Sequence, residues 1–167
     1  FANELSVICD KLGIDVWELI ALANRHPRVN ILQPGPGVGG HCIAVDPWFI
    51  VSKTPSEAKL IHSARIVNDN KPAWVIDKVN TEILGWLKSN PKKSINDITI
   101  ACYGLAFKPN IDDLRESPSL DIVRILSKEL PCRVIAIEPN ISKEMIKRID
   151  LEIVTFDHAL AHADINV

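Results

Sequence analysis

The stretch ITIACY, Ile98 to Tyr103, is the first of four short apolar segments that decide the fold of the chain's second half. Its length and its β-branched residues are typical of a buried strand. Three more strands are predicted at 133–137, 151–155 and 164–167, and helical patterns separate the four segments. Alternation of strands and helices predicts a parallel sheet of the α/β class.

The residues before this sheet predict an all-helical region. Apolar residues recur at helical spacing over residues 1–24, with a helix end at Gly13. The segment Thr-Pro-Ser-Glu at 54–57 has the pattern of a capping box, and it predicts a helix to about residue 87 with an interruption near Pro72. Between these helices, residues 25–54 hold four prolines and four glycines, which favour a long irregular loop.

A polar segment, 90–97, contains a proline and two adjacent lysines and marks the change from one pattern to the other. We therefore place a domain boundary there. The prediction is a helical domain over residues 1–93 and a parallel-sheet α/β domain over residues 94–167. The first residues resemble a helix already in progress and the last resemble the start of a strand, so we expect a truncated piece of a longer protein.

Composition excludes several classes of function. The chain has 167 residues and 47% hydrophobic residues, with 19 Lys plus Arg against 21 Asp plus Glu. This balance gives no reason to expect a nucleic-acid partner, and no apolar run reaches the length of a membrane span. The four cysteines form no CxxC pair, which favours free thiols in a cytoplasmic protein. His158 and His162 lack neighbouring ligands, so no metal site is expected.

The segment GPGVGGHCIAVDP, residues 35–47, holds four of the chain's seven glycines directly before Cys42. Glycines allow close backbone approach and point N–H groups at an oxygen, so a thiol in this setting suits covalent catalysis on a carbonyl. Asp46 lies four residues further on and is placed to hold a water or act as a base. The alternative is an exposed turn with an inert cysteine. No GK[ST] follows, which excludes a P-loop.

Two motifs carry a resemblance to a known family. GPGVGGHCIAVDPWF resembles the active-site segment of the UDP-glucose/GDP-mannose dehydrogenase family. GLAFKPNIDDLRESPS, residues 104–119, resembles the C-terminal signature G-x-x-F-K-x-x-x-x-D-x-R-x-S of the same family. The two motifs stand in the family's order, and the resemblance covers essentially the whole chain. It implies that residues 94–167 are a partial, Rossmann-like UDP-binding domain.

The resemblance implies a reaction and a set of roles. Family members oxidise the C6 alcohol of a nucleotide-sugar to a carboxylate with two NAD⁺ in succession. Cys42 matches the nucleophile, which would form a thiohemiacetal and then a thioester, and Asp46 matches the aspartate that orders the hydrolytic water. The other matched positions are the substrate-binding residues Lys108, Arg28, Gly37, Gly39, Gly40 and His41, and the cofactor-binding Arg115.

The strand at 98–103 is followed by one glycine where a dinucleotide fingerprint needs three. The resemblance therefore implies that NAD is bound mainly by an N-terminal domain absent from this chain, and that the chain alone is inactive. It also implies a homodimer through the central helices. The local alternative for Arg115 is a surface ion pair with Asp113.

His41 before the cysteine and Asp46-Pro47 after it resemble the family members that oxidise UDP-N-acetylhexosamines. The sequence around them most resembles that of the members that act on UDP-N-acetyl-D-mannosamine, whose product is used for surface polysaccharides. UDP-N-acetylglucosamine and UDP-glucose remain alternative substrates. Two readings of other classes remain open: an inactive nucleotide-sugar-binding or dimerisation module, and a thiol hydrolase, for which no His–Asn or His–Asp pair can be placed.

Overall fold

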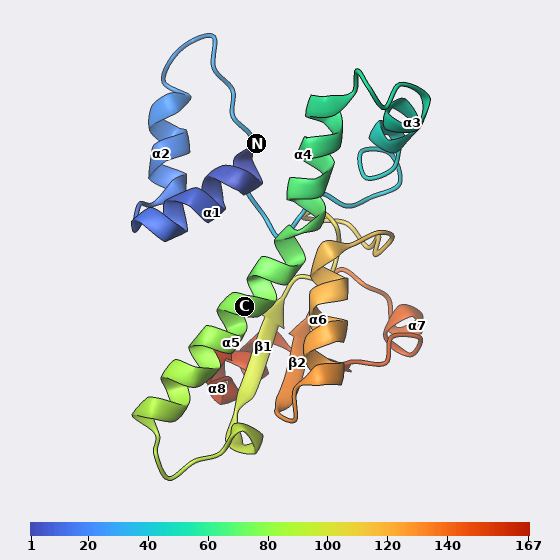
Figure 1. The fold of residues 1–167 in the computed structure, drawn as a ribbon. Helices are drawn as coiled ribbons and strands as arrows, with labels where there is room; N and C mark the ends of the chain where they lie inside the picture. The colour runs from blue at the N-terminus through green and yellow to red at the C-terminus, as the bar shows by residue number, and fades with distance from the viewer. The chain divides into compact units, whose positions relative to one another are not determined.

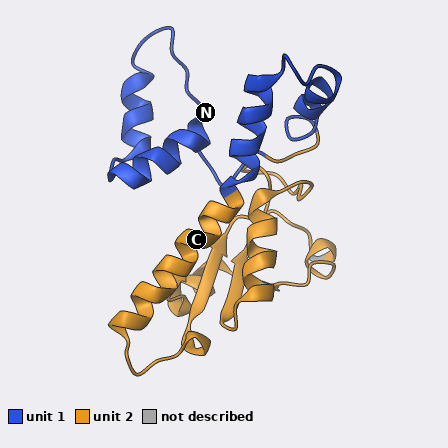
Figure 2. Ribbon diagram, in the orientation of Figure 1, with its two compact units in different colours: residues 1–38, 42–71 blue, residues 39–41, 72–167 orange. Residues whose placement is uncertain are grey.

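A computed structural model describes residues 1–167, apart from the side chain of Lys143. The chain forms two compact units, coloured separately in Figure 2. Unit 1 consists of residues 1–38 and 42–71, and unit 2 consists of residues 39–41 and 72–167. The expected boundary at residues 93/94 stays a prediction.

Unit 1 is helical. Its helices are α1 (Ala2–Leu12), α2 (Val16–Ala23), α3 (Asp46–Lys53) and α4 (Lys59–Asp69). Gly13 ends α1 in the left-handed conformation, with φ of 67°, as the sequence predicts. Buried apolar residues are few in this unit: Cys9, Ile20 and Ala58.

Two predictions for this region are wrong. Residues 46–53 form α3 inside the segment expected to be an irregular loop, because Pro47 lies in the first turn, where its missing N–H costs nothing. The capping box at Thr54 does not form. The Thr54 hydroxyl donates to the carbonyl of Ile50 at 3.1 Å, and α4 begins at Lys59 without a side-chain cap.

The expected interruption near Pro72 is confirmed. Helix α4 ends at Asp69, and α5 (Lys71–Ser89) begins two residues later with Pro72 in its first turn. Figure 1 shows α5 leading to the short 3₁₀ helix η1 (Ile95–Asp97), which precedes the sheet.

Unit 2 is a parallel α/β sheet, as predicted. Its elements are β1 (Thr99–Tyr103), α6 (Pro118–Glu129), β2 (Arg133–Ile137), α7 (Lys143–Ile146), β3 (Glu152–Ile153), α8 (Phe156–His162) and β4 (Ile165–Asn166). The strand order is β3-β2-β1-β4, and every pair is parallel. The chain therefore reverses its direction of winding between β1 and β4.

Side chains alternate between the two faces of this sheet, as strand geometry requires. Ile100 and Val134 face a core cluster with Val79 of α5 and Leu126 of α6. On the opposite face, Ala101, Ile135 and Ile137 pack with Ala159 of α8. Figure 1 shows α6 beside the sheet strands that it covers. None of the helices among the described residues is long and apolar enough to cross a membrane.

Candidate active site

Cys42 is the exposed cysteine of the chain, and it begins the turn that leads into α3. Its carbonyl oxygen accepts the N–H groups of Val45 at 3.0 Å and Asp46 at 2.8 Å. Asp46 is exposed and is the first residue of the helix. The turn therefore places the predicted nucleophile and the predicted water-ordering carboxylate at one local structure of unit 1.

The other three cysteines are buried: Cys9, Cys102 and Cys132. Burial, with a contribution from Cys132, raises the pKa of the Cys102 thiol to about 12, and burial also raises the pKa of Cys132. A thiol is a nucleophile only as the thiolate. The geometry thus leaves Cys42 as the cysteine that solvent and a substrate can reach.

Two of the glycines before Cys42, Gly39 and Gly40, belong to unit 2 and pack against other residues of that unit. A Cβ on Gly39 would lie 2.0 Å from the carbonyl oxygen of Glu116 and 2.8 Å from Cδ of Pro118. A Cβ on Gly40, whose φ is 86°, would lie 2.9 Å from the ring of Phe107. Both glycines are buried. Both positions therefore require glycine because another part of the chain lies too close for a side chain. The residues that lie so close belong to the second sequence motif, residues 104–119.

The second motif fills the connection from β1 to α6. Gly104 takes a φ of 88° directly after β1, and Leu105 is fully buried. The Ser117 hydroxyl donates to the carbonyl of Leu105 at 2.6 Å and also caps the first turn of α6. Both ends of this connection are thus tied to each other.

Glu138 follows β2, and the residue is 7% exposed. Its carboxylate accepts the N–H groups of Leu105 at 2.8 Å and Ala106 at 3.1 Å. It also accepts the Asn140 N–H at 3.1 Å and the Asn140 amide at 3.2 Å. Burial acts to raise the pKa of Glu138, but these hydrogen bonds together lower it, so the carboxylate stays charged.

Lys108 is exposed on the same connection, at the carboxyl end of β1, with its Nζ 5.6 Å from the centre of the Phe107 ring. Ligands of open α/β sheets bind at the carboxyl ends of the strands where the winding reverses. In this sheet that point lies between β1 and β4. Lys108 follows β1 at this edge of the sheet, and its role toward a phosphate group stays a prediction.

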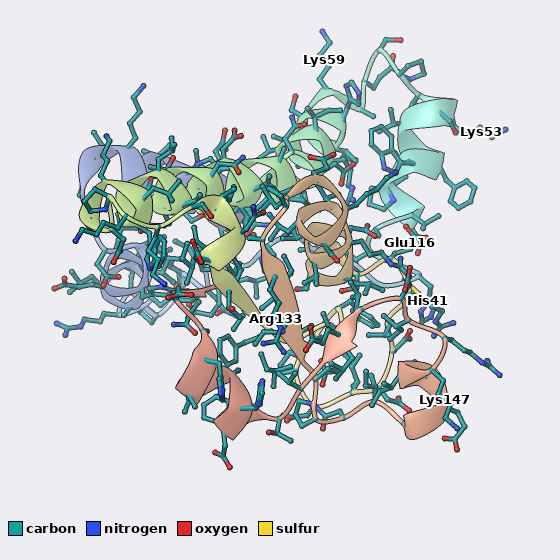
Figure 3. The ribbon with its side chains drawn as sticks, turned by 90° about the horizontal axis from the view of Figure 1, so that it is seen from below. His41, Lys53, Lys59, Glu116, Arg133 and Lys147 are labelled. Atoms are coloured by element: carbon teal, nitrogen blue, oxygen red, sulfur yellow. The ribbon has the colours of Figure 1, made fainter. Side chains whose placement is uncertain are left out.

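Arg115 forms a fork with Asp113. Its Nε donates to both carboxylate oxygens at 2.9 and 3.0 Å, and Nη2 donates to Oδ2 at 2.6 Å. These bonds, with the Arg115 N–H and the charge of His41, hold the pKa of Asp113 at about 2. Figure 3 labels His41 and Glu116, which lie at the same end of unit 2. The surface pairing weighed from the sequence is present, and a role for Arg115 toward a cofactor stays a prediction.

The described residues of unit 2 do not fit a dinucleotide. A Rossmann site needs a glycine-rich turn leading directly into a helix, and an acidic residue after the second strand for a ribose hydroxyl. Here Gly104 is the one glycine of a long connection, and the oxygens of Glu138 are taken by N–H groups of the chain. This sheet therefore lacks the parts of an NAD cradle.

The remaining sequence candidates lie in unit 1. Arg28 is exposed, and its N–H donates to Nδ1 of His26 at 3.3 Å. Within the residues that the structure describes, no hydrogen bond joins Arg28 to the Cys42 turn. Gly37 has a φ of 147°, a backbone conformation that glycine adopts readily.

Sequence reasoning missed the residues that hold these loops in place, among them Arg65, Asn68 and Glu138. An acidic residue directly after a predicted strand was a signal for Glu138. Arg65 and Asn68 lie on a helix where a charged and a polar side chain look like solvent-facing positions, and only their contacts in three dimensions reveal them.

The chain matches two domain models of one family. Residues 1–70 match the central domain of the UDP-glucose/GDP-mannose dehydrogenase family, and residues 101–167 match the UDP binding domain of that family.

Relatives of known function agree with this assignment. A UDP-N-acetyl-D-mannosamine dehydrogenase of Yersinia pestis is 60% identical over 86% of this chain and 34% of its own length. An NDP-N-acetyl-D-galactosaminuronic acid dehydrogenase of Ralstonia solanacearum is 53% identical over 100% of this chain and 37% of its own length. A solved UDP-N-acetyl-mannosamine dehydrogenase of S. aureus aligns with a TM-score of 0.72 and 39% identity, over 99% of this chain and 34% of that one.

The chain thus spans little more than a third of the length of these relatives. Within that span the helical unit, the parallel sheet and both domain matches agree with one another. The chain belongs to the UDP-glucose/GDP-mannose dehydrogenase family, of which it carries the central and UDP-binding domains.

Proposed function

We propose that this chain is part of an NAD-dependent dehydrogenase that oxidises UDP-N-acetyl-D-mannosamine to UDP-N-acetyl-D-mannosaminuronate. The observation that carries the proposal is the exposed Cys42 thiol at the start of a turn, in a chain whose other cysteines are buried. The choice of sugar rests on the 60% identity with the Yersinia pestis enzyme.

The chemistry divides into two oxidations and a hydrolysis. The first oxidation converts the C6 alcohol to an aldehyde and needs no sulfur. The Cys42 thiolate then adds to the aldehyde carbon, and the carbonyl oxygen takes up a proton to give a thiohemiacetal. Loss of a hydride from that carbon, together with loss of the proton of its hydroxyl group, gives a thioester. Water adds to the thioester, the carbon–sulfur bond breaks, and the thiol and the carboxylate are released.

Asp46 is proposed to order the water of the last step. It lies at the first turn of α3, and its N–H is bonded to the carbonyl of Cys42. A carboxylate fixed beside the nucleophile orients a water toward the thioester carbon and accepts its proton. The glycine segment Gly37–His41 is proposed to line the sugar's reactive end, with N–H groups available for the developing oxyanion.

Lys108 is proposed to bind the UDP pyrophosphate at the carboxyl end of β1. Arg28 is proposed to contact the substrate near the sugar. The hydride acceptor is NAD⁺, and because unit 2 lacks a dinucleotide cradle, we assign its binding to a further domain outside this chain, with Arg115 reaching toward it. We also propose that the uronate product supplies surface polysaccharide synthesis, that the protein is a homodimer through its central helices, and that it is cytoplasmic.

Turnover of the full-length protein tests the proposal. NADH formation is measured with four substrates: UDP-N-acetyl-D-mannosamine, UDP-N-acetylglucosamine, UDP-N-acetylgalactosamine and UDP-glucose. We expect the highest kcat/KM with the mannosamine sugar. The galactosamine sugar is the second candidate, because the Ralstonia solanacearum relative matches the whole chain at 53% identity.

The role of Cys42 is tested in the same assay. Cys42→Ala should abolish uronate formation while the variant still binds UDP by calorimetry, and Cys132→Ala serves as the control thiol. Uronate production at the wild-type rate by Cys42→Ala would refute the nucleophile assignment. UDP binding by a wild-type protein that oxidises no sugar would favour the binding module instead.

A further inference from the structure

Two asparagines of unit 1 hold the chain before Cys42. Asn68, near the end of α4, accepts the Val38 N–H at 2.8 Å, and its amide donates to the Val38 carbonyl at 3.3 Å. Asn3 of α1 accepts the Gly35 N–H at 2.8 Å, and its own amide donates to Asn68 Oδ1 at 3.1 Å. These bonds give the irregular segment the backbone partners that a regular element would supply.

A buried arginine holds the chain after Cys42. Nη1 of Arg65 donates to the carbonyl of Ile43 at 3.4 Å, and Nη2 forms a short ion pair with Asp69. Asp69 also accepts the amide of Asn68 at 3.3 Å. One connected set of side chains on a single helix therefore reaches Val38 on one side of Cys42 and Ile43 on the other.

The burial of Arg65 argues against an incidental contact. Its side chain is 10% exposed, and its Nε has no hydrogen-bond partner among the residues the structure describes. A guanidinium removed from water in this way costs free energy that its one ion pair offsets only in part. The buried guanidinium holds the carbonyl of Ile43, the residue that directly follows Cys42.

We propose that Asn3, Arg65, Asn68 and Asp69, here named the loop clamp, position the Cys42 thiol for its attack on the aldehyde. The inference rests on the proposed function of Cys42. None of the four residues is assigned a contact with substrate, so they are positioning residues. Addition to a carbonyl requires a narrow approach geometry, and displacement by about 1 Å can slow such a step by about a hundredfold.

The loop clamp predicts an unequal effect on the two oxidations. The alcohol is oxidised before sulfur takes part, whereas the aldehyde can be oxidised only after Cys42 has added to it. Loosening the clamp should therefore slow aldehyde oxidation more than alcohol oxidation. A variant that merely unfolds a fraction of the protein would slow both steps equally.

Hydrogen exchange of the full-length protein tests the clamp without substrate. Asn68→Ala should speed amide exchange over residues 38–43 by about tenfold or more, because the Val38 N–H loses its acceptor. Asn24→Ala is the matched control: Asn24 makes the same pair of bonds to Ile31, at 2.7 and 2.9 Å. The control should speed exchange at Ile31 and leave residues 38–43 unchanged.

Product analysis tests the chemistry with UDP-N-acetyl-D-mannosamine, NAD⁺ and hydroxylamine as a trap for free aldehyde. The wild type should give uronate and two NADH per sugar. Asp69→Ala should give trapped aldehyde and lower kcat for aldehyde oxidation by about tenfold, with the KM for the alcohol substrate unchanged. Asp69→Asn keeps an oxygen for Arg65 and should recover most of the lost rate.

Unchanged exchange over residues 38–43 in Asn68→Ala would overturn the loop clamp, as would an equal loss of both oxidations in Asp69→Ala. If the wild type oxidises none of the four UDP-sugars, the proposed function fails. The exchange comparison would still show whether the clamp fixes the Cys42 segment, so the two failures can be told apart.

Discussion

At Gly39 the backbone comes so close to the carbonyl oxygen of Glu116 that a hydrogen atom fits where a side chain would not. At Gly40 the same holds for the ring of Phe107, and a positive φ adds a second reason for glycine. Gly35 lies in the same segment, yet a Cβ there would meet nothing within 4 Å. The packing of the chain therefore requires glycine at Gly39 and Gly40, whereas at Gly35 there is space for a side chain.

Gly39→Ala is predicted to destabilise the full-length protein by about 1–3 kcal/mol, because the added methyl group forces the segment away from Glu116. Thermal unfolding measures the effect as a lower Tm. Gly35→Ala provides the control, with a Tm within about 1–2 °C of the wild type. Equal Tm values for the two variants would show that the close approach at Gly39 is absent in solution.

At the scale of elements, the β1–α6 connection is held by one side chain that follows β2 and by another at the start of α6. Glu138, after β2, binds the N–H groups that follow β1, and Ser117 ties the start of α6 back to Leu105. This connection carries Phe107, against which Gly40 packs, and Lys108 at the carboxyl end of the sheet. Its rigidity therefore matters to both motifs that marked the sequence.

Ser117→Ala is predicted to lower stability by about 1–2 kcal/mol, since it removes the α6 cap and leaves the buried carbonyl of Leu105 without its partner. Chemical denaturation measures the loss. Ser127→Ala changes an exposed serine inside the same helix and should leave stability unchanged or slightly higher. A loss of similar size in both variants would contradict the assigned role of the Ser117 hydroxyl.

At the scale of the molecule, the structure ties several carboxylates into hydrogen bonds that favour their charged form. The pKa values of Asp97, Asp113, Glu138 and Glu152 are all lowered. A lowered folded-state pKa contributes stability that is fully present above the carboxyl's ordinary range, near 4. That contribution is lost as the pH falls through the lowered value, because the unfolded chain then binds more protons than the folded one.

The full-length protein is therefore predicted to lose Tm progressively from about pH 5 downward, with the contribution of Asp113 persisting to about pH 2. Thermal melts over this range measure the slope. Asp113→Asn combined with Glu138→Gln should give lower stability at neutral pH and a shallower loss on acidification. A steeper fall of Tm on acidification in this double variant would show that these carboxyls do not stabilise the fold through lowered pKa values.

Much of the fold of unit 2 follows from local sequence pattern. The strand at 133–137 was predicted with its observed bounds, because an apolar run of that length between helical patterns has few other solutions. The third strand is shorter than expected. The hydroxyl of Thr155 caps α8, although Asp157 close by is also of a residue type that caps helices. Competition between neighbouring capping side chains is decided by backbone angles that the sequence does not specify.

The sequence by itself determined the alternation of strands and helices in unit 2, the parallel class of the sheet and the two motifs that identify the family, because periodicity and short motifs are local properties of the chain. Only the tertiary structure decided which glycines have no space for a side chain. It also decided that the Glu138 carboxylate accepts N–H groups of the chain itself, and that Arg65 and Asn68 form hydrogen bonds to the backbone on either side of Cys42. Each of these depends on residues far apart in the sequence meeting at hydrogen-bond or van der Waals distance, which no local pattern encodes.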